Sequence, residues 1–302
     1  MSDLHGFSTA LADAVARIGP GVVRVEGRRR PSSGVVFGDG DLVITAAHTL
    51  ESDEIEVGLH DGRTLRAALI GRDAATDVAA LRVEGAGLTA APWLEAGAAF
   101  ELRPGDLALA VSRPGRTARA ALGVVSAISE GEWRTPGGGR LDRYLETDVA
   151  MRPGFSGSAL VDARGRVVAL NTAGLSRGSA SAVPAPTIRR LVEQLRAHGG
   201  VPRGYLGIST LSARLPASLA EKLGQPAALL VAAVDADSPA GRAGVLLGDA
   251  LVSLDGRALT HPGELLEALD ESSVGRAAKA RLIRAGQLSD IDITIGRREA
   301  RP

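Results

Sequence analysis

The spacing of apolar residues changes several times along the chain. Between Phe7 and Ile18 apolar side chains recur every three or four positions, which predicts a short amphipathic helix over residues 7–18. After Gly19 and Pro20 the pattern becomes a series of short β-branched runs separated by Gly, Asp and Pro, which favours a β-barrel or a sandwich. The expected strands cover residues 22–25, 35–37, 42–45, 54–59, 78–83, 107–111, 121–128, 144–147 and 167–172, with a long Gly-rich loop at 131–140.

A second predicted helix, followed by a return to strand-like sequence, indicates a domain boundary. Residues 185–198 carry one apolar face and stop at Gly199, and strand-like sequence resumes after Pro202. We therefore expect a first domain over 1–198, a linker over 199–204 and a compact α+β domain over 205–302. The elements expected in this last part are strands at 228–234, 249–254, 277–284 and 288–295 and helices at 239–243 and 262–270.

Composition narrows the possible functions. The 302 residues carry 35 basic and 35 acidic side chains, so no net charge attracts nucleic acid or an anionic membrane. The absence of cysteine excludes disulfides, thiolate nucleophiles and Cys-ligated zinc, and we expect neither a metal nor a cofactor. No apolar run is long enough for a membrane span. The start lacks the features of a signal peptide, which predicts a cytoplasmic protein if the chain is complete, and a cell-envelope or periplasmic one if an export segment was removed.

Three short motifs carry candidate chemistry, and the first two supply a histidine and an aspartate. His48 follows the apolar strand in LVITAAHTL, a position from which its ring can face a cleft, although an ordinary loop histidine has the same appearance. Asp77 in GRDAATDVAALRV directly precedes a buried strand and can orient an imidazole. Asp73 is its competitor, four residues earlier in a polar turn.

The third motif, MRPGFSGSAL, places Ser156 in a tight turn between Gly154 and Gly157. Glycines let consecutive backbone amides point into one small space, where they can form an oxyanion hole beside the serine hydroxyl. A plain Gly/Ser turn and the G-x-S-x-G elbow of α/β hydrolases are the alternatives. The elbow fits less well, because Ser158 occupies its last glycine position and that fold has a different order of catalytic residues.

In chain order the three residues are His48, Asp77 and Ser156, the order of chymotrypsin-type enzymes. The strings TAAH, TDVAAL and TDVAMRPGFSGSAL around them resemble those of the HtrA (Deg) family of serine proteases. The resemblance covers nearly the whole chain, including DARGRVVALNTA after the serine. It implies a mainly β protein with a chymotrypsin-like double β-barrel followed by an α+β PDZ domain.

The resemblance assigns roles to these residues. It implies Ser156 as nucleophile, His48 as general base and acid, Asp77 as the residue that orients His48, and the amides of Gly154 and Ser156 as the oxyanion hole. The sequence departs from the family around the serine: Phe155 replaces a small polar residue and Ser158 a glycine. Arg152 also stands where a neutral polar residue is usual. These departures keep an inactive, peptide-binding adaptor or holdase as the alternative to an endopeptidase.

For the last domain the resemblance implies a function in binding the C-termini of peptides. GYLGI at 204–208, with Tyr205, Leu206, Gly207 and Ile208, matches the carboxylate-binding loop of the family's PDZ domain. A peptide would add as a strand beside it. The helix at 262–270 would form the opposite wall, with Leu265, Leu266 and Leu269 as pocket candidates or core residues. The substrates implied are unfolded or misfolded proteins, and the assembly implied is a homo-oligomer, typically a trimer.

Overall fold

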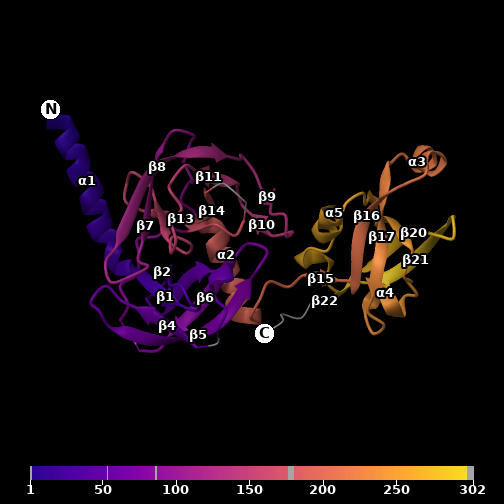
Figure 1. Cartoon of the computed structure of the whole chain (residues 1–302), viewed down its shortest axis with the longest axis horizontal. Coiled ribbons are helices and arrows are strands. Elements are labelled where there is room, and N and C mark those ends of the chain that lie inside the picture. The colour runs from indigo at the N-terminus through magenta and orange to yellow at the C-terminus, as the bar shows by residue number, and fades with distance from the viewer. Residues whose placement is uncertain (1, 53, 86, 176–179, 298–302) are drawn as a thin grey trace. The chain divides into compact units, whose positions relative to one another are not determined.

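The computed structural model describes residues 2–52, 54–85, 87–175 and 180–297. They divide into two compact units, Met1–Gly200 and Val201–Pro302 (Figure 1). None of the described helices has the length and apolar character that a membrane-spanning helix requires.

The first unit begins with helix α1 (Ser2–Ile18) and a 3-10 turn, η1 (Gly19–Gly21), followed by a closed six-stranded barrel. The strands lie in the order β1-β2-β3-β6-β5-β4, and pairing of β4 with β1 closes the sheet. Buried apolar side chains such as Val23, Val36 and Leu81 fill its interior. The strands are β1 (Val22–Glu26), β2 (Ser32–Phe37), β3 (Leu42–Ala46), β4 (Ile55–Gly58), β5 (Thr64–Asp73) and β6 (Val78–Val83), with the 3-10 turn η2 (Ala47–Thr49) after β3.

A second closed barrel of six strands follows in the order β11-β14-β13-β12-β7-β8. Its core includes Val125, Leu160 and Phe155. The strands are β7 (Leu107–Ser112), β8 (Arg119–Ile128), β11 (Leu145–Thr147), β12 (Ala159–Val161), β13 (Val167–Thr172) and β14 (Ala180–Pro184), with the two-stranded hairpin β9 (Trp133–Arg134) and β10 (Arg140–Leu141) between β8 and β11. Two barrels in succession confirm the double-barrel fold expected from the sequence.

Two features join the barrels. Trp93 lies in the segment between them; its indole donates to the Val36 carbonyl at 2.9 Å, and its backbone forms an isolated β-bridge with Val167. Helix α2 (Ala185–His198) packs against β5 and β6 of the first barrel and against β13 and β14 of the second. It ends at Gly199, whose left-handed conformation (φ 70°) lets its amide bond the Leu195 carbonyl.

The second unit is an α+β domain with one main sheet, in which β16-β17-β18-β20-β21 are neighbours and β19 pairs with β18. Its core contains Leu229, Leu251 and Leu282, all almost completely buried. The elements are β15 (Gly204–Tyr205), β16 (Ile208–Arg214), α3 (Ala217–Leu223), β17 (Ala227–Val234), α4 (Pro239–Arg242), β18 (Ala250–Leu254), β19 (Arg257–Ala258), α5 (Pro262–Ala268), η3 (Glu271–Ser273), β20 (Ala277–Arg284), β21 (Gln287–Thr294) and β22 (Gly296–Arg297).

Several elements differ from the sequence prediction. The first helix starts at Ser2, five residues before Phe7, and α5 ends at Ala268 rather than at residue 270. Strand β5 was not expected, because TLRAALIGRD has few β-branched residues; its strand state comes from pairing with β4 and β6 on both sides. The unexpected elements include β5, β12, β14, β19, β22 and α3, together with the hairpin β9–β10 inside the expected loop 131–140.

An ion pair in the second unit, between a buried carboxylate and an arginine that is 41% exposed, gives a test of the stability of that unit. Asp249 is 2% exposed and accepts both Nε (2.8 Å) and Nη2 (2.7 Å) of Arg284, and also the Leu246 amide at 2.8 Å. Burial acts to raise the pKa of Asp249, but the hydrogen bonds from Arg284 and from the Leu246 amide outweigh it and hold the pKa below its ordinary value. The stabilisation is therefore present above the unfolded-state pKa of about 3.9 and is lost as pH falls through the folded-state pKa.

We expect Asp249→Asn to destabilise this unit by about 2 kcal/mol at neutral pH, because it weakens charge-assisted hydrogen bonds at a buried site. Calorimetric unfolding of the whole chain measures the change. The matched control is Asp290→Asn, which breaks a pair with Arg281 whose two side chains are 39% and 50% exposed. That control should cost less than about 1 kcal/mol. Equal losses for the two variants would contradict the account.

Candidate active site

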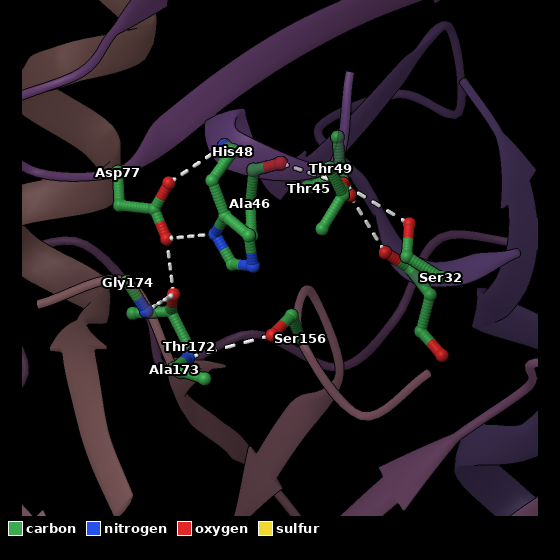
Figure 2. Close-up of polar contacts among 11 residues, drawn as sticks. Ser32, Thr45, Ala46, His48, Thr49, Asp77, Ser156, Thr172, Ala173 and Gly174 are labelled. Atoms are coloured by element: carbon green, nitrogen blue, oxygen red, sulfur yellow. Dashed lines mark hydrogen bonds and ion pairs between the residues drawn. The ribbon is translucent and has the colours of Figure 1, made fainter. Parts of the chain in front are cut away.

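His48 is placed by the short turn that follows β3. It lies in η2, and its backbone amide donates to Oδ1 of Asp77 at 2.8 Å. Its ring Nδ1 lies 2.7 Å from Oδ2 of the same carboxylate, while the side chain remains 33% exposed. In the view of Figure 2 the ring lies between Asp77 and Ser156. Asp77 therefore holds one ring nitrogen, Nδ1, and the other, Nε2, makes no hydrogen bond to the described residues.

Asp77 is held in an uncommon backbone conformation at the end of the turn between β5 and β6. Its φ is +57°, in the left-handed region that few residues other than glycine occupy, and it is 3% exposed. Besides His48, its Oδ2 accepts the hydroxyl of Thr172, which in turn accepts the Gly174 amide at 2.9 Å. This network fixes the carboxylate against His48 (Figure 2).

Asp73, the competing carboxylate, has a different set of partners. Its Oδ2 accepts the Thr76 hydroxyl at 2.7 Å and the Thr76 amide at 3.2 Å, and Oδ1 accepts the Ala75 amide at 3.4 Å. These bonds organise the turn that presents Asp77. The structure therefore brings Asp77, and not Asp73, to His48.

Ser156 comes from the second barrel, in the turn before β12. It is 9% exposed, and its Oγ accepts the Ala173 amide at 3.4 Å. Within the described residues it makes no hydrogen bond to His48, although both side chains border the same space (Figure 2). Gly157 is required there, because a Cβ at its φ of +81° would lie 2.0 Å from the Ser33 carbonyl oxygen.

The amides of the serine turn fall into two groups. Those of Phe155, Gly157 and Ser158 are bonded to the carbonyls of Arg152, Asn171 and Phe155, at 3.0, 2.8 and 3.0 Å. Those of Gly154 and Ser156 donate to no acceptor among the described residues. Two free N–H groups beside a serine hydroxyl can stabilise a developing negative charge.

The two unusual residues of this turn point into the protein. Phe155 is 1% exposed and belongs to the core of the second barrel. Ser158 is fully buried, and its Oγ accepts Nδ2 of Asn171 at 3.0 Å. Arg152 is exposed. Phe155 and Ser158 thus anchor the turn from inside and leave the free amides unobstructed.

Sequence reasoning missed Thr172 and Gly174. Thr172 bonds Asp77, and a Cβ on Gly174 would lie 2.3 Å from Oδ2 of Asp77 and 2.9 Å from Nδ1 of His48. The string NTAG after a buried strand was the available signal, but nothing in it indicates a partner 95 residues earlier. Over the described ranges, no group of three or more His, Cys, Asp or Glu side chains is arranged to hold a metal ion.

The residues expected to bind peptide in the second unit differ in their hydrogen bonding and burial. The amides of Leu206 and Gly207 donate to no acceptor in the described part of the chain, whereas their carbonyls accept the amides of Ala240 and Asp235, both at 2.9 Å. The Tyr205 hydroxyl donates to Asp235 at 2.6 Å, and Ile208 starts β16 half-buried.

The three leucine candidates divide between the core and the surface. Leu265 and Leu269 are 5% and 7% exposed and belong to the core, whereas Leu266 is 37% exposed. Leu269 lies just past the last residue of α5.

Comparison with known proteins agrees with this geometry. A family described as "Trypsin-like peptidase domain" matches residues 32–170, and one described as "PDZ domain" matches residues 204–295. A relative from Halomonas elongata named "Probable periplasmic serine endoprotease DegP-like" is 32% identical and aligns with 90% of this chain and 57% of its own length. A relative of the same name from Ectopseudomonas mendocina is 33% identical, over 98% of this chain and 64% of its own length. The chain thus spans about six-tenths of these curated relatives.

Solved structures are similar over nearly their full length. "HtrA-type protease AlgW with decapeptide" superimposes with a TM-score of 0.70 at 27% identity, covering 96% of this chain and 99% of that one. "Crystal structure of the serine endoprotease from Yersinia pestis" gives 0.71 at 27% identity, covering 96% and 98%. The chain therefore belongs to the HtrA-type serine proteases, with a trypsin-like peptidase domain followed by a PDZ domain.

Proposed function

We propose that this chain is a serine endopeptidase that hydrolyses peptide bonds in unfolded proteins, with His48, Asp77 and Ser156 as its catalytic triad. The observation that carries the proposal is that each of the two barrels supplies one part of the site. The first barrel supplies an imidazole held by a buried carboxylate at 2.7 Å, and the second supplies a serine beside two unbonded amides. Acyl transfer needs a base, a nucleophile and a site for the oxyanion, and each has a residue here.

The reaction follows from these positions. The Ser156 hydroxyl rotates from the Ala173 amide toward Nε2 of His48 and gives up its proton to that nitrogen as Oγ attacks the substrate carbonyl carbon. The carbonyl oxygen gains the electron pair and is held by the amides of Gly154 and Ser156. His48 then passes the proton to the leaving amine nitrogen as the C–N bond breaks. Water then attacks the acyl carbon as His48 takes its proton, and His48 returns that proton to Oγ of Ser156 as the ester bond breaks, which releases the new C-terminal acid and restores the serine.

Asp77 acts on His48 rather than on the substrate. Its Oδ2 accepts the proton of Nδ1, which leaves Nε2 as the basic nitrogen facing the serine, and its charge stabilises the imidazolium that forms. Thr172 donates to the same oxygen, so the carboxylate keeps its orientation through the proton transfers. The contact at Nδ1 thus fixes the tautomer of the ring and places Nε2 toward the serine, as both roles require.

The alternative function, an inactive adaptor or holdase, depended on Phe155 and Ser158. Their burial within the second barrel, with the Gly154 and Ser156 amides unbonded, supports the enzyme instead. Incubation of the purified protein with unfolded casein separates the two. An endopeptidase yields new internal N-termini that mass spectrometry identifies, while a holdase suppresses aggregation and leaves casein intact, which would contradict the proposal.

For the PDZ unit we propose binding of C-terminal peptide tails with apolar last residues. The unbonded amides of Leu206 and Gly207 support a carboxylate site, and the free edge of β16 supports strand addition. A small apolar pocket discriminates side chains by only about 1–3 kcal/mol, so the selectivity should be broad. Exposed Leu266 is the better candidate for ligand contact, because Leu265 and Leu269 are committed to the core.

We expect a peptide with a free hydrophobic C-terminus to bind the protein at least about tenfold more tightly than its amidated form, because a carboxylate forms charge-assisted bonds with the loop amides. Fluorescence anisotropy with the Ser156→Ala protein measures both affinities without cleavage of the peptide. Equal affinities would show that the 204–208 loop does not recognise a carboxylate.

The cellular location of the protein and its oligomeric state are the last two points. Of the two locations that the sequence left open, the periplasmic one agrees with the names of the curated relatives. The homo-oligomer implied by the family resemblance stays a prediction, and light scattering on the purified chain decides it.

A further inference from the structure

Ser33 connects the first barrel to the serine turn of the second. It lies in β2 and is fully buried. Its amide donates to the Ser156 carbonyl at 3.1 Å, and its hydroxyl donates to the Gly154 carbonyl at 2.8 Å. One residue of the first barrel thus bonds the two carbonyls that flank Phe155 in the turn.

The positions of these two carbonyls determine where the free amides point. The Ser156 N–H belongs to the peptide plane between Phe155 and Ser156, and the planes before and after it carry the carbonyls bonded to Ser33. Only the two backbone dihedral angles of one residue separate each peptide plane from the next. Hydrogen bonds that fix the planes before and after the Ser156 N–H therefore restrict the orientation of the plane that carries it. The Gly154 N–H lies in the plane just before the one that carries the Gly154 carbonyl, in a turn closed by the 3.0 Å bond from the Phe155 amide to the Arg152 carbonyl.

Arg113 in turn fixes the Ser33 hydroxyl. Its backbone amide donates to Ser33 Oγ at 2.9 Å, so that the hydroxyl proton is directed to Gly154. Its side chain donates to the carbonyls of Val22, Arg116 and Gly19, at 2.7, 2.7 and 2.8 Å.

The environment of Arg113 is unusual for a cation. The residue is 5% exposed, and no carboxylate pairs with it in the part of the chain that the structure describes. Burial lowers the pKa of this guanidinium. A buried cation is tolerated only where its donors are satisfied, so the three carbonyls hold Arg113 in one position.

We propose that Ser33 is a positioning residue for catalysis, which holds the turn around Ser156 with its two oxyanion-binding amides free, and that Arg113 holds Ser33. The inference rests on the proposed peptidase function and deepens it. Ser33 touches neither the substrate nor the reacting atoms. Its effect on turnover passes through the backbone of residues 154–156.

The test compares Ser33→Ala with Ser112→Ala, another fully buried serine whose hydroxyl makes one long contact, 3.4 Å to the Arg119 carbonyl. Casein-derived peptide cleavage should lose about 10²-fold in kcat in Ser33→Ala with little change in KM, because misplaced oxyanion donors act on the transition state. Ser112→Ala should retain its kcat. Ser33→Thr, which restores a hydroxyl, should recover most of the loss, whereas a purely structural role for Ser33 would lower the amount of folded enzyme and not its kcat.

Hydrogen exchange measured by mass spectrometry gives a readout that does not require activity. Peptides covering residues 150–158 should exchange roughly tenfold faster in Ser33→Ala than in wild type or in Ser112→Ala, because the turn is released. If wild type cleaves and Ser33→Ala matches it in kcat, this proposal is overturned while the proposed function stands. If wild type does not cleave, the proposed function fails, and unchanged exchange in Ser33→Ala then overturns this inference as well.

Arg113→Lys is the second variant, should Ser33→Ala fail to fold. Lysine keeps the charge but lacks the planar fork that reaches three carbonyls. It should lower kcat about tenfold and speed exchange at residues 150–158, in the same direction as the loss of the Ser33 hydroxyl. A fully active Arg113→Lys protein with unchanged exchange would overturn the role of Arg113.

Discussion

Replacing Ser156 by alanine is expected to reduce the cleavage of unfolded casein by about 10⁶-fold in kcat, the loss seen when a triad nucleophile is removed. The fold should not change, because the hydrogen bond that the serine hydroxyl makes within the described residues is a long one, 3.4 Å from the Ala173 amide. Casein degradation followed by gel and by mass spectrometry measures the effect.

The Ser112→Ala protein is the matched control, since it loses a buried hydroxyl whose contact in the described residues is a long one, 3.4 Å to the Arg119 carbonyl. It should degrade casein at the wild-type rate. If Ser156→Ala degraded casein as fast as wild type, the nucleophile would have to be another residue, and the assignment would fail.

Replacing Asp77 by asparagine is expected to lower turnover by roughly 10⁴-fold with little effect on substrate binding. Asparagine keeps the size of the side chain but can present an N–H to Nδ1 of His48, which selects the wrong tautomer of the imidazole. Steady-state kinetics on a peptide substrate should therefore show the loss in kcat and a KM close to that of wild type.

Asp73→Asn provides the comparison within the same turn. Asp73 accepts hydrogen bonds from Ala75 and Thr76 within its own turn, so its replacement should act mainly on stability, by about 1 kcal/mol. A damaging Asp73→Asn combined with a harmless Asp77→Asn would reverse the roles proposed for the two carboxylates.

The three candidate catalytic residues could be proposed from the sequence because each sits in a local string and the strings have an informative order. The residues that hold them in place, such as Ser33 and Thr172, lie in no recognisable local string. Ser33 and Gly154 are 121 positions apart, and Thr172 and Asp77 are 95 apart, so only the closure of two barrels against each other brings them together. The left-handed conformation of Asp77 is likewise a consequence of the network around it and not of its own preference.

The strands and helices likewise divide into those that the local sequence predicted and those that it did not. Strands rich in Val, such as β1 and β13, were expected from their composition. Strand β14, with the sequence ASAVP, was not, because alanine, serine and proline favour no strand; it forms by pairing with β11 and β13 on either side. In α5 the apolar face was correctly expected, but spacing alone could not tell a core leucine such as Leu265 from an exposed one such as Leu266.

The central claim is that Ser156 is a nucleophile activated by His48, and labelling with a fluorophosphonate probe tests it most directly. The probe forms a stable bond with an activated serine oxygen and does not require a substrate that the enzyme prefers. We expect one adduct per folded chain, located on Ser156 by tandem mass spectrometry and abolished by His48→Ala or by prior denaturation. An unlabelled wild-type protein, or an adduct on any other serine, would contradict the account.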